Sequence, residues 1–266
     1  MRAMLRRRLV LARAACAAAS PLPLLAAAAP ERAADPLRLA VDDALVESGL
    51  AQRLQHSFGR DTGLALRVIS QPATALLAAL ERGEHDAALC NAPRAEQALA
   101  AQGLVTDRRV IGRAEFVLVG PAALVKPLDA GNDAALALQR LAQVQAAFLT
   151  RGDGSGTHLA EQALWRAAAT APEAPWYLPA SAPGRWWDEA RERNACMLVD
   201  RGAWAAHKLR DFAVLSEDAA RLIVDVHVMR SFRTRHPSAK LLADWLAGRL
   251  GRRVVDATPG YRLPPR

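Results

Sequence analysis

Short apolar runs of strand length alternate with helical segments along most of the chain, and this alternation constrains the fold more than any other feature of the sequence. Leu37–Val41 and Asp86–Cys90 are two such runs. Between them, apolar residues recur at helical spacing, as Leu50, Leu54 and Phe58 do. The pattern predicts an α/β protein with mixed, mostly parallel sheets and helices on both faces of the sheets.

The rest of the chain follows the same alternation. We expect further strands at 64–70, 113–120, 146–150, 195–199, 212–215 and 222–229. We expect further helices at 74–81, 96–101, 134–147, 157–169, 186–193, 204–209 and 239–250, with a Pro- and Ala-rich loop at 171–184. The length of 266 residues and the hydrophobic content of 52% allow two lobes with a sizeable core and exclude disorder as the main state.

The first 34 residues differ in composition from everything that follows. Residues 2–8 carry four arginines, and the longest uncharged stretch, 14–29, is short for a membrane span and contains prolines. A basic start, a short apolar segment and small residues predict a secretory signal peptide that is cleaved within 28–34, and therefore a periplasmic protein. Cys16 suggests a lipoprotein instead, but Arg13 stands where a lipidation signal needs an aliphatic residue. We therefore favour plain cleavage.

The net charge of +8 does not predict a nucleic-acid partner. The signal segment contributes most of this charge, and the remainder of the chain carries only +3. Three lysines among 35 basic residues indicate an arginine-rich composition more than a phosphate-binding surface. Cleavage leaves Cys90 and Cys196, each in an apolar run, and we expect both to be buried core residues without a disulfide.

A glycine-rich turn between a strand and a helix is the segment that carries chemistry. Residues 148–165 run from the strand through this turn into the helix. Glycines allow close approach of a ligand to backbone N–H groups, and the first turn of a helix supplies unpaired donors and a positive dipole end. Arg151 adds a positive charge, and Ser155 and Thr157 add hydroxyl donors. The turn therefore predicts a site for a small oxyanion, although Ser155 serving only as a helix cap is the simpler alternative.

The Arg151–His158 segment, with Glu161 and Trp165 after it, closely resembles the tungstate-binding proteins of ABC importers. Further matches lie at 92–93, 115–121, 176–177 and 200–202, in the family's order. The resemblance implies a two-lobed periplasmic-binding-protein-like fold of type II. It also implies a signal peptide at 1–34, a first lobe at 35–113 that returns at 214–266, and a second lobe at 114–213.

The first lobe departs from the family at the end of its first strand. The family has threonines and a serine there, whereas this chain has Asp42 and Asp43. Carboxylates facing an anion in a closing cleft cost Coulomb energy. The turn after the second strand begins at Ser70 and also differs from the family's glycine-rich turn. The candidate ligand-binding residues are Arg151, Gly154, Ser155, Gly156, Thr157, Asp42, Asp43 and Ser70.

Other functional classes fit the residues less well. The Gly152–Gly156 segment is superficially similar to the nucleophile segment of trypsin-like proteases, but Gly154 separates the aspartate from the serine and the all-β pattern is missing. An integrin-type role for Arg151–Asp153 rests on three residues only. The six histidines show no metal-ligand spacing, so we expect no metal site. We also expect no cofactor and no enzyme chemistry. Trp186 and Trp187 follow a loop and would favour an organic ligand if they line the cleft.

Two functional hypotheses remain. In the first, the chain is an exported monomeric solute-binding protein that captures a tungstate- or molybdate-like oxyanion and delivers it to a membrane ABC permease. In the second, it is a diverged sensor or accessory protein that recognises a different, possibly organic, small ligand. The intact turn supports the first hypothesis, and Asp42 and Asp43 support the second.

Overall fold

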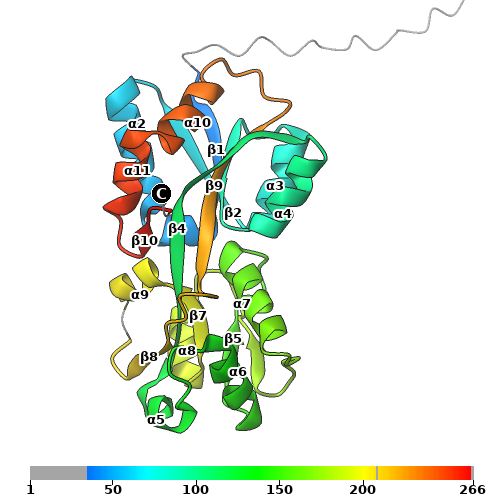
Figure 1. Cartoon of the computed structure of the whole chain (residues 1–266), viewed down its shortest axis with the longest axis vertical. Helices are drawn as coiled ribbons and strands as arrows, with labels where there is room; N and C mark the ends of the chain where they lie inside the picture. Colours follow the sequence, from blue (N-terminus) through cyan, green and yellow to red (C-terminus); the bar gives the residue numbers. More distant parts are fainter. Residues whose placement is uncertain (1–34, 208, 265–266) are drawn as a thin grey trace, which may run out of the picture. The chain divides into compact units, whose positions relative to one another are not determined.

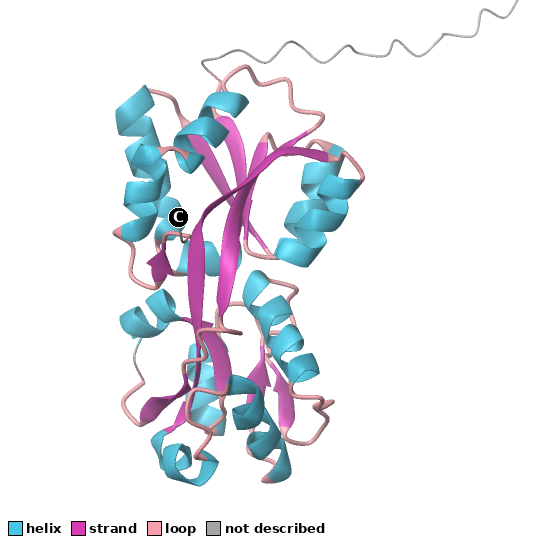
Figure 2. Cartoon of the chain, in the orientation of Figure 1, coloured by secondary structure: helices cyan, strands magenta, loops and turns pink. Residues whose placement is uncertain are grey.

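The computed structural model describes residues 35–207 and 209–264. The expected signal peptide lies outside the described residues. Figure 2 shows helices packed around strands, so the predicted α/β class is confirmed. We call residues 35–113 and 223–264 lobe 1 and residues 114–222 lobe 2, and this division remains our proposal. Among the described residues, no helix is long and apolar enough to cross a membrane.

Lobe 1 contains three short strands that pair in parallel, β2–β1–β3, with helices packed around them. Its strands are β1 (Leu37–Asp42), β2 (Leu66–Gln71), β3 (Ala87–Cys90) and β10 (Tyr261–Arg262). Its helices are α1 (Asp43–Glu47), α2 (Leu50–Thr62), α3 (Ala73–Arg82), α4 (Pro93–Ala101), α10 (Ala239–Ala247) and α11 (Arg249–Asp256). Gly83 ends α3 in the left-handed conformation with a φ of 80°.

In its described residues, lobe 2 is built from short strands, one 3-10 turn and five α-helices. Its strands are β5 (Phe148–Thr150), β6 (Tyr177–Pro179), β7 (Met197–Asp200) and β8 (Phe212–Ser216). Its helices are the 3-10 turn η1 (Ala122–Leu124), α5 (Val125–Leu128), α6 (Ala134–Gln143), α7 (Gly156–Ala167), α8 (Trp186–Arg193) and α9 (Arg201–His207). Helix α8 has the bounds that the sequence predicts.

Two long antiparallel strands, β4 (Val105–Pro121) and β9 (Ile223–Ser231), connect the lobes (Figure 1). β9 pairs with β3 in lobe 1, and β4 pairs with β7 and β8 in lobe 2, all antiparallel. The expectation that the sheets are mostly parallel is therefore wrong in this detail, because every strand that pairs with β4 or β9 does so in the antiparallel sense. β8 pairs with β4, so we place the return to lobe 1 after β8 and not at residue 214.

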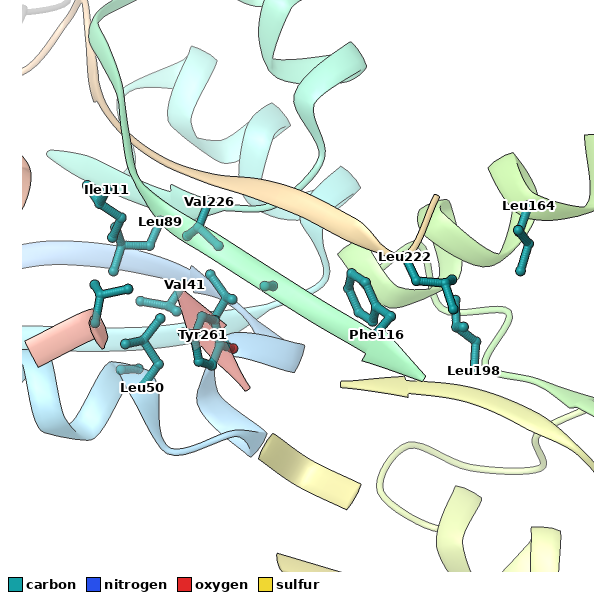
Figure 3. Close-up of a cluster of buried hydrophobic side chains, with 14 of the residues drawn as sticks. Val41, Leu50, Leu89, Ile111, Phe116, Leu164, Leu198, Leu222, Val226 and Tyr261 are labelled. Carbon is teal, nitrogen blue, oxygen red and sulfur yellow. The ribbon is translucent and has the colours of Figure 1, made fainter. Parts of the chain in front are cut away.

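One continuous hydrophobic cluster follows β4 through both lobes. Figure 3 shows Leu89 and Ile111 at one end of this cluster, Phe116 on β4, and Leu198 and Leu164 at the other end. All five side chains are at most 3% exposed. Because the cluster spans the crossing strands, apolar burial stabilises the junction between the lobes as well as each lobe. Within the described part of the chain, Cys90 and Cys196 are buried free thiols, as predicted.

Several elements differ from the sequence-based expectation. Helices α1, η1 and α5 and strand β10 lie where no element is expected. β4 starts at Val105, well before the expected 113, because its first half is polar and pairs with β9 through ion pairs. β6 lies within the segment expected to be a loop. The last expected helix is divided at Gly248 into α10 and α11.

Candidate anion site at the start of helix α7

The turn before α7 is held in shape by its own side chains. Gly152 and Gly154 have φ values of 63° and 74°, which only glycine adopts without strain. The Asp153 carboxylate accepts a hydrogen bond from the Ser155 N–H at 2.9 Å, and the Ser155 hydroxyl oxygen accepts one from the His158 N–H at 3.3 Å. His158 Nδ1 accepts the Gly154 N–H at 2.9 Å. Asp153 and His158 thus hold the turn in shape, and Ser155 caps the helix.

The Asp42 carboxylate lies directly against the start of α7. Its Oδ2 accepts the Gly156 N–H at 2.9 Å, and its Oδ1 accepts the Ala44 N–H at 3.0 Å, where Asp42 caps α1. The side chain has no exposed surface. Burial raises the pKa of Asp42 to about 7, although both backbone hydrogen bonds and Arg151 lower it. A carboxylate therefore occupies the helix terminus at which the sequence predicts an oxyanion.

Arg151 forms an ion pair across the two lobes. Its Nη1 and Nη2 each donate to the Glu47 carboxylate at 3.0 Å, and its Nε donates to Asp153 at 2.9 Å. The guanidinium also lies over the Trp186 ring, with its carbon 3.9 Å from the ring centroid. Burial acts to lower the pKa of Arg151, but the two carboxylates raise it above its ordinary value. Burial likewise raises the pKa of Glu47, and Arg151 only partly offsets this.

Two buried polar side chains at the same helix terminus have no hydrogen-bond partner among the residues that the structure describes. They are Thr157, through its hydroxyl, and Asn91, through both amide atoms, and each is 1% exposed. A Cβ atom added to Gly156 would stand 1.7 Å from Asn91 Oδ1, so only glycine allows this amide to approach the helix. Buried polar groups in proteins are almost always paired. Asn91 and Thr157 therefore mark a place where a polar ligand has donors available.

The candidate residues do not all gather at one point. Gly154 lies at the lobe boundary, because its carbonyl oxygen accepts the Thr74 N–H at 3.2 Å. Asp43 and Ser70 form a separate hydrogen bond of 2.5 Å at a more exposed position. The structure thus brings Asp42, Arg151, Gly156 and Thr157 together, and leaves Asp43 and Ser70 at the side.

Glu47 and Asn91 lie in the candidate site, although the sequence did not single them out. Asn91 directly follows β3, and residues at strand ends of this kind collect ligands in α/β sheets, which is the signal that would have identified it. Glu47 ends the short helix α1 and begins the stretch 47–50, which follows as expected for the tungstate-binding family, but nothing in that stretch marks Glu47 as a partner of Arg151.

A small cavity beside Arg151 extends the site into lobe 2. Its lining includes Glu47, Thr157, Trp186, Trp187 and Asp200. The volume that the centre of a water molecule can occupy in it is about 10 Å³. Such a space holds about one water molecule. An oxyanion at this position therefore requires the Glu47 carboxylate, or the two lobes, to move.

A third buried carboxylate lies at the cavity wall and joins lobe 2 to β10. Asp200 Oδ1 accepts the Gly202 N–H at 2.7 Å, and its Oδ2 accepts the Tyr261 hydroxyl at 3.1 Å. The Tyr261 and Ser48 hydroxyls are 2.7 Å apart. Burial raises the pKa of Asp200 to about 7. Within residues 35–264, apart from the undescribed position 208, no three His, Cys, Asp or Glu side chains are grouped to hold a metal ion.

The chain has two α/β lobes joined by crossing strands, and the start of α7 lies at the boundary between the lobes. This is the architecture of periplasmic-binding-protein-like domains. The family described as the PBP superfamily domain matches residues 26–225, and the chain belongs to this family.

Two of the curated relatives that the chain matches are tungstate-binding proteins. The chain is 32% identical over 173 residues to the tungstate-binding protein TupA of Peptoclostridium acidaminophilum, over 64% of this chain and 60% of that protein. The chain spans between 50% and 61% of the length of the curated relatives that it matches. The resemblance to tungstate-binding proteins that the Arg151–His158 segment predicts is confirmed by this relative.

Two solved structures agree with this relationship. The tungstate ABC transporter structure from Geobacter sulfurreducens has a TM-score of 0.72 and 28% identity, and the match covers 84% of this chain and 98% of that chain. The tungstate-binding protein TupA from Desulfovibrio alaskensis G20 has a TM-score of 0.70 and 25% identity, with 87% and 100% covered. The predicted two-lobed fold is therefore confirmed.

Proposed function

We propose that the chain is an exported solute-binding protein that captures a small oxyanion between its lobes and delivers it to a membrane ABC permease. The single observation that carries this proposal is the arrangement at the start of α7, where the Gly156 N–H already holds a carboxylate oxygen at 2.9 Å. The unpartnered Thr157 hydroxyl and Asn91 amide and the charge of Arg151 add donors at the same place. Because the chain is similar to tungstate-binding proteins, tungstate is the first ligand to test.

The donor set explains why an oxyanion suits the site. An oxyanion offers only hydrogen-bond acceptors, so its binding groups must be donors. Backbone N–H groups, a hydroxyl, an amide and a guanidinium provide them without a lysine. We include Arg151, Gly154, Ser155, Gly156 and Thr157 in the proposed site, with Asn91 added to them.

A thermal-shift screen tests the proposal directly. A ligand that binds only the folded chain raises the melting temperature with the logarithm of its concentration. We expect tungstate or molybdate to raise it, and sulfate or phosphate to do so more weakly. The doubly substituted variant Arg151→Ala, Thr157→Ala serves as the control that should lose the shift. The absence of a shift with all four anions, at both acid and alkaline pH, would contradict the proposal.

A second candidate function is the recognition of an organic ligand with a positive group by a sensor or accessory protein. The observation that favours it is the presence of two carboxylates, Asp42 and Glu47, among the donors, with Trp186 and Trp187 lining the adjacent cavity. Small amino acids and amines, added to the same screen, test this candidate. A shift with these ligands and not with oxyanions would favour it.

Export and partnership with a permease are also proposals. The composition of the first 34 residues supports export. N-terminal sequencing of the mature protein from a periplasmic extract tests it, and a start within residues 28–34 is the expected result. Association with a permease is tested by transport assays in membranes that hold a candidate ABC permease from the same organism.

A further inference from the structure

Asp42 and an external oxyanion require the same hydrogen-bond donor. Asp42 Oδ2 holds the Gly156 N–H at 2.9 Å, and the side chain is fully buried at the junction of β1 with α7. Gly156 is the first residue of a helix of 12 residues, so its N–H is one of the donors that would face a bound anion. As long as Asp42 is an ionised carboxylate, it competes with the ligand for this donor.

The surrounding side chains indicate that a ligand belongs at this place. The Thr157 hydroxyl and the Asn91 amide are unpartnered and 99% buried, and the amide faces the start of the same helix. Asp42 leaves these polar atoms unused in the structure. An oxyanion at the helix terminus would supply acceptors for the hydroxyl and for the amide nitrogen.

The charged groups around Asp42 determine whether an anion can bind beside its ionised carboxylate. Arg151 is the cation that acts on Asp42, and Asp43 is an anion that opposes its ionisation. Cys90 from β3 and Tyr261 from β10 also face Asp42, and burial raises the pKa of both groups well above their ordinary values, so both are neutral. Arg151 is already paired with Glu47 and Asp153. An oxyanion bound beside an ionised Asp42 adds a second negative charge to a site that is buried away from water. Little positive charge remains there to compensate it.

We propose that Asp42 is a specificity-determining residue that couples the capture of a fully deprotonated oxyanion to the uptake of one proton by its carboxylate. Protonation converts Asp42 Oδ2 from an acceptor that competes with the ligand into an O–H group that donates to it. The proton comes from solvent and leaves with the ligand. The inference rests on the proposed function, because it assumes that the oxyanion binds at the start of α7. The pKa of about 7 makes this proton available near neutral pH.

Calorimetric titration with sulfate and with tungstate tests the inference. Titrations in buffers of different ionisation enthalpy measure the number of protons taken up per anion bound. We expect about one proton at pH 8, and an affinity that falls about tenfold for each pH unit above 7, as linkage to a single proton requires. The variant Asp42→Asn should bind without proton uptake and without this pH dependence, and at pH 8 it should bind more tightly than the wild type. Asp43→Asn, the matched control at the neighbouring carboxylate, should keep the proton uptake.

The outcomes separate this inference from the proposed function. Oxyanion binding without proton uptake in the wild type, at pH 8 and pH 6.5 alike, would overturn the inference and leave the proposed function intact. If neither the wild type nor Asp42→Asn binds either anion at any pH, the proposed function fails as well. The proton count in the wild type decides the matter even if Asp42→Asn does not fold.

Discussion

Arg151 and Glu47 meet through two parallel hydrogen bonds of 3.0 Å each, and the two residues come from different lobes. The arginine side chain is 8% exposed and the glutamate side chain 25% exposed. Paired bonds of this kind are directional as well as strong, so the pair fixes how the turn before α7 faces α1. We propose that the Arg151 guanidinium also binds the ligand. The same side chain would then both hold the two lobes together and contact the oxyanion.

Replacement of Arg151 by alanine should destabilise the protein before any effect on binding is considered. The change leaves Glu47 and Asp153 without their shared partner and removes the contact with Trp186. Breaking a buried pair of this kind costs about 3–5 kcal/mol. Urea denaturation measures the loss, and Arg191→Ala, which breaks an exposed pair with Asp188, is the control and should cost less than about 0.5 kcal/mol. Equal effects of both changes would contradict the structural role of Arg151.

Replacement of Glu47 by glutamine should strengthen oxyanion binding. The amide keeps the shape of the side chain but removes a negative charge that competes for Arg151. We expect an affinity gain on the order of tenfold, which corresponds to about 1.4 kcal/mol. Calorimetric titration with tungstate at low salt measures it. Glu192→Gln removes a charge from an exposed pair with Arg185 and should leave the affinity unchanged. Weaker binding in Glu47→Gln would show that the carboxylate takes part in holding the ligand.

Gly156 should not tolerate a side chain. A methyl group there would stand 1.7 Å from Asn91 Oδ1, which cannot move away because the amide is buried. Gly156→Ala should therefore lower the free energy of unfolding by more than about 1 kcal/mol and abolish oxyanion binding. Gly59→Ala lies inside α2 with a nearest contact of 3.7 Å and should stabilise the chain by about 0.5–1 kcal/mol. Thermal denaturation compares the two, and a harmless Gly156→Ala would disprove the close approach of Asn91.

Stability should fall as the pH rises from 5 to 8. Burial raises the pKa of Asp42, Glu161 and Asp200 to about 7 each in the folded protein. The folded state then holds protons that the unfolded chain has released above about pH 4, so the stabilisation is present at low pH and is lost as the pH passes about 7. Between about pH 4 and pH 7, each of the three groups lowers the free energy of unfolding by about 1.4 kcal/mol for every unit by which the pH rises.

The variant Asp200→Asn isolates one of these groups, because it removes a titrating proton outside the proposed binding residues. The slope of the unfolding free energy between pH 5 and 7 should decrease by about one proton relative to the wild type. Asp188→Asn, at an exposed carboxylate, should keep the wild-type slope. Urea denaturation at several pH values measures all three proteins. An unchanged slope in Asp200→Asn would mean that Asp200 titrates in the folded protein as it does in the unfolded chain.

Local patterns in the sequence were enough to predict most helices and strands, since the features that define them lie within a few residues of one another. Gly83 ends α3, and the glycines before Gly156 open α7, for reasons of backbone conformation alone. The first half of β4 was missed because its polar residues suit a loop as well as a strand. Its strand conformation depends on partners far along the chain, such as the ion pair between Asp107 and Arg230.

Only part of the candidate site could be predicted from the sequence, for a similar reason. The turn at Arg151–His158 is a local motif, and its resemblance to a known family locates it. The contact between Asp42 and Gly156 joins residues 114 positions apart. The pairing of Arg151 with Glu47 spans 104 positions. No periodicity reveals such contacts, because they arise only when β1 and α7 are brought together by the folded sheet.

The pairing of β4 with β9 has a consequence for how the chain folds. Residues 116–222 are synthesised between the two halves of this ladder, so the strands that join the lobes form among the least local contacts of the molecule. Contacts between residues so distant in sequence form slowly, because the intervening chain must first be closed into a loop. Lobe 2 can begin to fold on the ribosome before β9 emerges, whereas the sheet of lobe 1 lacks a strand until then. A nascent chain that ends before residue 223 would therefore expose the free edge of β3, which makes this stage of synthesis the one most open to aggregation.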